Sequence, residues 1–188
     1  MLEWWRPRSP ASTGGCMVTS RKMFRFLNMN TLKNINEAFS NRLEPLNIIG
    51  SNQLSEDEYD DVMFFKNNHW SELTCTQLEA HYEGIYWLSP EAFCYFLPRI
   101  ISAGIRENKP DLMIYNSIIE MLDRSPDPSS WDRFFIDRWT MLSSIECEAV
   151  QEWVLWLADN VSNTYYENSF NRAFESLELL KQGVTSIG

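Results

Sequence analysis

Helix start signals recur along this chain, each placed directly ahead of an apolar stripe. In a capping box, a serine or threonine and the glutamate three residues later each accept a hydrogen bond from the other residue's backbone amide. This pattern occurs at Ser55–Glu58, Thr76–Glu79, Ser143–Glu146 and Thr164–Glu167. After each signal, apolar residues recur every three or four positions, as one face of an α-helix requires. The repeated signals indicate a chain built from helices.

The same helical period runs from about residue 30 to residue 182, and no pair of alternating strands with a hairpin turn interrupts it. Breaks between the periodic segments are rich in serine and proline, as in RSPDPSS at 124–130. The patterns predict an all-α fold with a single compact, bundle-like domain of about six or seven helices over residues 30–182. A short tail, 183–188, begins with Gly183, which is suited to end the last helix.

The first 29 residues differ from the rest of the chain. They hold two prolines and a Gly-Gly pair and show no sustained period. Residues 1–33 carry six Lys or Arg and one acid, whereas the remaining chain carries ten Lys or Arg and 25 Asp or Glu. We expect residues 1–29 to be a flexible, basic N-terminal segment, or sequence upstream of a true start at a later methionine.

The helical domain is therefore strongly acidic. An acidic surface repels nucleic-acid phosphates and anionic membranes, and it attracts basic proteins. We expect a protein partner with a basic surface, and neither nucleic acid nor membrane; the oligomeric state stays open. The chain has no apolar run of about 18 residues and no secretory signal, and Cys16, Cys75, Cys94 and Cys147 lie far apart. These features favour a reducing cytoplasm, with no structural zinc site and no disulfide framework.

The stretch YWLSPEAFCYFLPRI, residues 86–100, predicts one long helix with a proline inside it. Ser89 suits the N-cap position and Pro90 the first helical turn. The apolar stripe keeps its phase across Pro98, which favours a single bent helix over two separate ones. An internal proline costs about 3 kcal/mol, whereas each large apolar side chain buried nearby contributes about 1.5–3 kcal/mol. Packing can therefore hold the helix together.

The run LSPEAFCYFLP at 88–98, preceded by Trp70-x-x-Leu73, resembles a bacterial family of uncharacterised all-α proteins with an LSPEAFxYFLP-like motif. The likeness spans about 30 residues. Arg99 stands where members of that family tend to have a small residue. The resemblance implies an ordered bacterial domain with Pro98 as part of its pattern, and it implies no activity.

Two groups of residues are candidates for binding a partner. The densest acidic cluster follows Ser55, and it is interpreted as a solvated helix face, a docking surface for a basic protein or a metal site; the spacing of an EF-hand is missing. The polar face of the helix after Ser89 adds an aromatic and a basic side chain. The candidate partner-binding residues are Glu56, Asp57, Glu58, Asp60, Asp61, Tyr95 and Arg99.

Signs of catalysis are sparse. His69 and His81 are the only histidines, and each lies six residues from Cys75, which puts the pairs on different faces of a helix. No Gly-rich phosphate loop, HExxH motif or GxSxG elbow occurs. We therefore expect no catalytic residues, no cofactor and no metal.

The interpretation favoured by the sequence is a non-enzymatic, acidic protein-binding domain. Its most specific form is an immunity or antitoxin-like protein that docks on a basic toxin. Two alternatives stay open. One is an enzyme with a carboxylate/His site in a helical pocket, for which Glu79, His81 and Glu83 are the candidates. The other is a structural subunit of a homodimer that buries an aromatic face.

Overall fold

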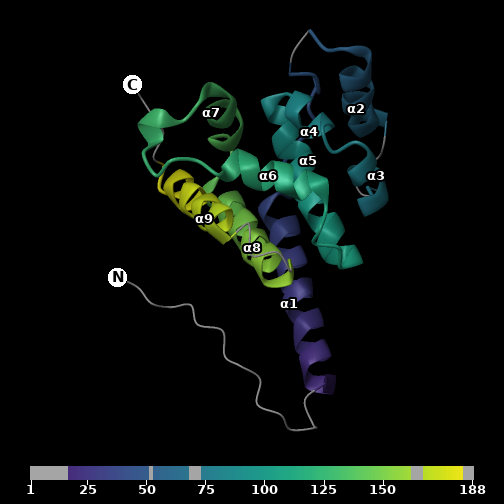
Figure 1. Cartoon of the computed structure of the whole chain (residues 1–188), viewed down its shortest axis with the longest axis vertical. Coiled ribbons are helices and arrows are strands. Elements are labelled where there is room, and N and C mark those ends of the chain that lie inside the picture. The colour runs from purple at the N-terminus through teal and green to yellow at the C-terminus, as the bar shows by residue number, and fades with distance from the viewer. Residues whose placement is uncertain (1–16, 51–52, 68–72, 162–166, 184–188) are drawn as a thin grey trace.

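The computed structural model describes residues 17–50, 53–67, 73–161 and 167–183, and every regular element in these residues is helical (Figure 1). The helices are α1 (Met17–Ala38), α2 (Glu56–Asn67), α3 (Cys75–Ala80), α4 (Gly84–Trp87), α5 (Pro90–Glu107), α6 (Met113–Leu122), the 3-10 helix η2 (Pro128–Ser130), α7 (Arg133–Trp139), α8 (Ser144–Asn160) and α9 (Glu167–Lys181). The predicted all-α fold is confirmed. The described residues hold more helices than the six or seven expected because α3 and α4 are separate short elements of six and four residues.

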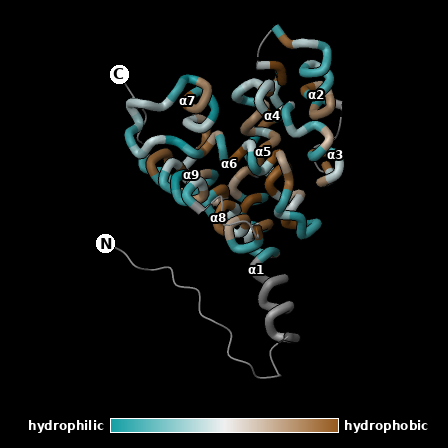
Figure 2. The backbone as a smooth tube through the Cα atoms, in the orientation of Figure 1, coloured by the Kyte–Doolittle hydropathy of each residue, from teal (hydrophilic) through white to brown (hydrophobic). Residues whose placement is uncertain are grey.

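The helices form two connected parts (Figure 1). In the first, α8 packs against α1 and α9, α9 also contacts α6, and α5 contacts α1 and α7. In the second, α2 packs on α4, while α3 contacts α5 and α6. Figure 2 shows hydrophobic segments concentrated where α5, α6 and α8 meet. The core therefore lies around these three helices, and α2 to α4 form a smaller layer beside it.

Helix α5 is continuous through its internal proline, as the unbroken apolar stripe predicts. The Ser89 hydroxyl accepts a hydrogen bond from the amide of Ala92 at 3.2 Å and donates to the carbonyl of Asn47 at 2.8 Å. Pro98 is buried, and the helix runs on to Glu107. Twelve of its 18 residues are buried, which makes α5 the central core helix.

A tyrosine hydroxyl from α6 enters the backbone ladder of α5. The Tyr115 hydroxyl donates to the carbonyl of Ile100 at 2.9 Å and accepts from the amide of Gly104 at 2.6 Å. These two backbone groups are four residues apart, the spacing of a regular helical hydrogen bond. A Cβ at Gly104 would meet the tyrosine ring and would come within 2.7 Å of the carbonyl oxygen of Lys109. The glycine therefore permits the close contact between α5 and α6.

The loop before α2 is anchored to the segment that joins α4 and α5. Ile49 forms an isolated antiparallel bridge with Leu88. The amide of Gly50 donates to the carbonyl of Trp87 at 2.8 Å, and the amide of Ser89 donates to the carbonyl of Ile48 at 2.8 Å. These bonds fix the end of α4, which carries part of the candidate site described below.

Two of the predicted capping boxes form as expected. The Ser55 amide donates to Glu58 at 2.7 Å at the start of α2, and the Ser143 amide donates to Glu146 at 2.7 Å at the start of α8. The predicted box at Thr164 lies outside the described residues. The predicted box at Thr76 is wrong.

The cap of α3 lies two residues earlier than predicted, at Thr74. Its side chain accepts from the amide of Gln77, and the Gln77 side chain accepts from the Thr74 amide. Glutamine completes a capping box as glutamate does. Glu79, which the sequence pattern assigned to a box, instead accepts a hydrogen bond from the amide of Met113, at the start of α6.

Helix α1 starts at Met17, before the predicted boundary at residue 30. Residues 17–29 contain neither proline nor glycine, so nothing in their composition stops the helix once the packed part has formed. The start of the helix therefore differs from the sequence prediction. Residues 1–16 and the tail from residue 184 lie outside the described residues.

Candidate functional site

A pocket of about 360 Å³ opens between the α3–α4 segment and helix α6. Four of its residues come from 82–87, and four come from one face of α6 at positions i, i+3, i+4 and i+7. This spacing is the repeat of a helix face. The lining residues are Tyr82, Glu83, Tyr86, Trp87, Met113, Asn116, Ser117 and Glu120.

Each glutamate of the pocket lies next to a tyrosine hydroxyl. Tyr82 donates to Glu83 at 2.9 Å, and this hydrogen bond raises the pKa of the tyrosine. The Tyr86 hydroxyl interacts with Ser117 and Glu120 on the facing helix. Burial is the main reason why the pKa of Tyr86 is raised. Both tyrosines therefore stay protonated at neutral pH and can orient the two carboxylates.

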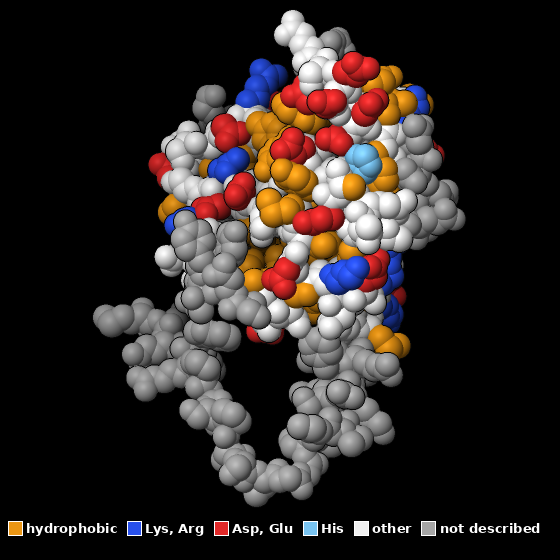
Figure 3. Space-filling view, turned by 45° about the vertical axis from the view of Figure 1, so that its right-hand side comes forward, with side chains coloured by type: hydrophobic (Ala, Val, Ile, Leu, Met, Phe, Trp, Pro, Cys, Tyr) orange, Lys and Arg blue, Asp and Glu red, His pale blue; other side chains and the backbone are white. Residues whose placement is uncertain are grey.

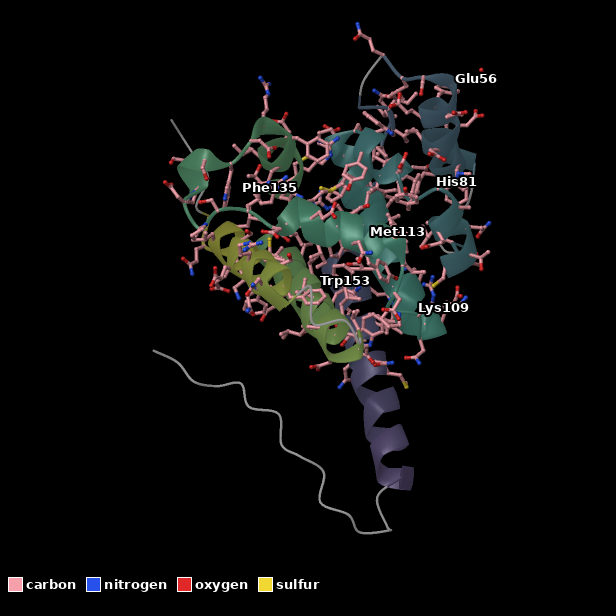
Figure 4. All side chains as sticks on the ribbon, viewed as in Figure 1. Glu56, His81, Lys109, Met113, Phe135 and Trp153 are labelled. Atoms are coloured by element: carbon pink, nitrogen blue, oxygen red, sulfur yellow. The ribbon has the colours of Figure 1, made fainter. Side chains whose placement is uncertain are left out.

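Helix α6 is held in place at the pocket by a carboxylate from α3. Leu112, the N-cap of α6, provides no side-chain acceptor. Glu79 supplies one and accepts from the Met113 amide at 2.9 Å. A negative charge at this end of a helix is also favoured by the helix dipole. Figure 4 labels Met113 at the start of α6 and His81 just after the end of α3, on neighbouring elements.

The opposite wall is held by a buried arginine from α7. Arg138 is 7% exposed, and its guanidinium donates to the carbonyls of Leu88 at 2.8 Å and Tyr86 at 3.2 Å. It also lies 3.6 Å from the ring centre of Phe134. Burial lowers its pKa, although an arginine stays charged at neutral pH. Its N–H groups therefore satisfy two carbonyls at the end of α4 and fix the wall that carries Tyr86.

A close approach of α2 to α4 places an acidic helix beside the pocket. Gly84 opens α4 at a point where a Cβ would come 2.8 Å from the carbonyl oxygen of Asp61. His81 lies between the two helices in sequence, and its Nδ1 is 2.8 Å from Oδ1 of Asp61. The His81 ring stacks on Phe64 of α2 with 4.3 Å between ring centres. Helix α2 is therefore fastened to the segment that lines the pocket.

The acidic cluster predicted for partner binding occupies α2, and its members have different roles. Glu58 completes the capping box with Ser55, and Asp61 pairs with His81. Glu56, Asp57 and Asp60 are exposed. Among the described residues, these three carboxylates form no hydrogen bond or ion pair, although Glu56 and Asp57 lie in the first turn of α2, where the helix dipole favours negative charge.

Tyr95 and Arg99, the other two predicted residues, lie elsewhere. Arg99 donates to Asn36 of α1 at 2.8 Å, and burial lowers its pKa to about 10. Tyr95 packs edge-on against Phe96, and its pKa is raised by burial first and by Glu44 second. Both are half-buried between α5 and its neighbours, so the structure does not bring them together with the pocket.

The residues considered for catalysis are also dispersed. Of the three glutamate and histidine candidates, only Glu83 lines the pocket, because Glu79 caps α6 and His81 pairs with Asp61. Burial raises the pKa of Cys75 to about 11, and this thiol stays protonated at neutral pH. His69 lies outside the described residues.

Across the described ranges, no group of three or more His, Cys, Asp or Glu side chains is arranged to hold a metal ion. Among the helices of these same ranges, none combines the length and the apolar character needed to cross a bilayer.

The sequence prediction missed most of the pocket. Tyr86, Trp87 and Glu120 are not among the predicted site residues, because no local pattern shows that residues 82–87 meet α6. One face of α6 forms an apolar stripe that meets the core. The opposite face of α6 carries Met113, Asn116, Ser117 and Glu120 at helical spacing. A mixed polar face of this kind opposite an apolar stripe is a weak signal, since most helix faces turned to solvent are polar.

A family model covers residues 32–176 and is described as a family of unknown function, DUF6714. No curated protein and no solved structure matches the chain. The match spans most of the chain, including every residue of the pocket. The chain therefore belongs to this uncharacterised family of unknown function.

Proposed function

We propose that this chain is a cytoplasmic, non-enzymatic protein-binding domain whose acidic side docks on a basic protein. An immunity or antitoxin-like protein that neutralises a basic toxin would use such a surface. The observation that carries the proposal is that α2, which bears three exposed carboxylates, packs on α4, and α4 forms part of a pocket that contributes two more. Figure 3 shows acidic side chains interspersed with hydrophobic ones on the side of the molecule that carries α2 and α3.

The charge of the whole chain supports this proposal. The formal net charge is −10 at pH 7, and the acids lie mostly beyond residue 33. Complementary charge raises the rate at which two proteins meet, and salt weakens this effect. Aromatic side chains within a polar surround are the usual anchors of a protein interface. An acidic surface with a partly exposed tryptophan combines both properties.

The proposal is tested by capturing proteins from cells of the native host at low and at high salt. The test variant neutralises the exposed carboxylates of α2 and combines Glu56→Gln, Asp57→Asn and Asp60→Asn. The matched control neutralises three exposed carboxylates on α8 and α9 and combines Glu148→Gln, Asp159→Asn and Glu175→Gln. The two variants change the net charge by the same amount and differ only in the helices from which the charges are removed.

We expect one basic protein to be retained by the wild type and by the control, and to be lost from the α2 variant and at high salt. Purified partner should then bind the α2 variant about tenfold more weakly or worse, since several interface charges are removed together. Equal loss of the partner from the α2 variant and from the control would show that overall charge is responsible, and retention by the α2 variant at the wild-type level would show that these carboxylates make no contact. Either result would refute docking through α2.

A further inference from the structure

The pocket carries two carboxylates and no basic side chain among its described lining residues. Glu83 and Glu120 are exposed and stand on different walls, one before α4 and one on α6. Two arginines lie close to these walls, but Arg138 donates to the carbonyls of Tyr86 and Leu88, and Arg124 donates to the Glu120 carbonyl and pairs with Asp132. The pocket therefore presents unbalanced negative charge to a ligand.

Aromatic rings complete the lining. Tyr82, Tyr86 and Trp87 contribute ring surface next to the two carboxylates. The face of an aromatic ring attracts a cation, and the attraction is largest when the cation is partly withdrawn from water. Carboxylates bind the same cation through charge-assisted hydrogen bonds. Rings and carboxylates together therefore select a positively charged, planar or compact group.

The size of the pocket limits the ligand. Pockets that hold drug-sized molecules range over about 300–1,000 Å³, and this one, at about 360 Å³, lies near the lower end. One long side chain fits this space better than an extended cofactor does. A side chain also suits a pocket that adjoins the proposed docking surface on α2.

We propose that the pocket receives an arginine side chain of the basic partner. The inference rests on the proposed docking function and names the group that anchors it. The guanidinium donates to Glu83 on one wall and to Glu120 on the other, and its plane lies against the aromatic rings. Arginine suits this arrangement better than lysine because its five donors lie in one plane and can serve two carboxylates at once.

The two tyrosine hydroxyls prepare the carboxylates for this role. Tyr82 donates to one oxygen of Glu83, which leaves the other oxygen to accept from the ligand. The Tyr86 hydroxyl lies close enough to Ser117 and Glu120 to interact with both side chains, so it can orient Glu120. An arrangement fixed before binding loses less side-chain freedom when the ligand enters.

The first experiment titrates the whole chain with the tripeptide Gly-Arg-Gly, blocked at both ends so that the guanidinium is its only charge. The readout is the indole N–H resonance of Trp87 in two-dimensional NMR. This indole nitrogen is buried, and it has no hydrogen-bond acceptor among the described residues. Peptides with lysine and with citrulline in place of arginine separate charge from shape, because citrulline has nearly the shape of arginine without its charge.

We expect a saturable shift with arginine, a weaker one with lysine and none with citrulline. The double variant Glu83→Gln, Glu120→Gln should bind the arginine peptide at least about tenfold more weakly, as the loss of two charged acceptors implies. The matched control Glu148→Gln, Glu175→Gln should bind as the wild type does. An equal response to citrulline, or unchanged binding by the pocket variant with an unchanged melting temperature, would overturn the proposal.

A second experiment separates this inference from the docking function. If the pocket variant captures the partner as well as the wild type does while the α2 variant loses it, docking stands and the arginine pocket is refuted. If the arginine peptide binds the pocket but no basic partner is captured, the assignment of the guanidinium to a partner protein is refuted. Loss of the partner from both variants would support both proposals.

Discussion

At the scale of single residues, the described tryptophans differ in how deeply they are buried. Trp139 and Trp153 are fully buried, and Trp131 and Trp156 are nearly so. Trp87 alone among the described tryptophans is partly exposed, and it lines the pocket. The described tryptophans therefore lie mostly in the core, and Trp87 is the one among them whose ring stays partly accessible.

At this same scale, Tyr115→Phe should lower the free energy of unfolding by about 1–3 kcal/mol, the cost of leaving buried backbone groups without a partner. The hydroxyl that it removes connects the carbonyl of Ile100 with the amide of Gly104, and the side chain is fully buried. Urea unfolding followed by far-UV circular dichroism measures the change. The control Tyr82→Phe removes a hydroxyl close to solvent and should have a clearly smaller effect. Equal effects of the two variants would contradict the structural role of the bridge.

At the scale of elements, a buried ion pair joins the loop after α1 to the start of α8. Arg42 donates to both oxygens of Glu146, at 2.6 and 2.7 Å, and to the carbonyl of Met141 at 2.6 Å. The Glu146 side chain is 6% exposed and also completes the capping box with Ser143. A buried carboxylate that keeps its charge needs such partners. The pair therefore fixes both the cap of α8 and the position of the preceding loop.

Arg42→Leu should destabilise the protein by about 2–3 kcal/mol, because the carboxylate of Glu146 stays buried without its cation. The control is Lys33→Leu, which removes a cation from an exposed pair with Glu37. That pair is 69% and 66% exposed, so its loss should cost less than about 0.5 kcal/mol. Thermal unfolding of both variants gives the comparison. A small effect of Arg42→Leu would mean that water reaches Glu146 and replaces the arginine.

The helices themselves could be predicted from the sequence, because their signals are local. Ser143 and Glu146 stand three residues apart, and the stripe on α8 follows them directly. The predicted cap at Thr76 is wrong because Thr74 offers the same chemistry two residues earlier. Glu79 is taken by α6, a contact between residues 34 apart that no local pattern reveals.

At the scale of the whole molecule, stability should fall as the pH falls through the acidic range. Burial alone would raise the pKa of Glu146, but hydrogen bonds from Arg42 and Ser143 outweigh it and hold the pKa below its ordinary value. The hydrogen bonds from Arg172 lower the pKa of Asp123 in the same sense. A carboxyl group with a lowered pKa in the folded state stabilises the fold above its unfolded pKa, about 4, and this contribution is lost as pH falls through the folded pKa.

We therefore expect the urea midpoint to drop below about pH 4, where these groups take up protons on unfolding. Glu146→Gln should show a smaller drop than the wild type because its side chain no longer titrates. Glu175→Gln, an exposed position, should follow the wild-type curve. Because the overall charge changes equally in both variants, the difference between them isolates the buried group. Identical curves for the two variants would contradict the lowered pKa of Glu146.

The candidate site, unlike the fold, could not be predicted from the sequence. Its halves, residues 82–87 and the outer face of α6, are separated in the chain by α5. Periodicity tells which face of a helix meets the core, but it does not tell which two solvent faces meet each other. The acidic cluster on α2 can be predicted from the sequence because its residues are nearly contiguous in the chain. Its adjacency to the pocket depends on Gly84, whose missing side chain lets α4 approach α2.

The contact between Gly104 and Tyr115 has a consequence for how this family can change over evolutionary time. The tyrosine can be replaced while the glycine stays, at the cost of one hydrogen-bonded bridge. The glycine cannot gain a side chain first, because a Cβ there meets both the tyrosine ring and the carbonyl of Lys109. Relatives without the tyrosine should therefore still keep the glycine, because the carbonyl of Lys109 blocks a Cβ whether or not the tyrosine ring is present.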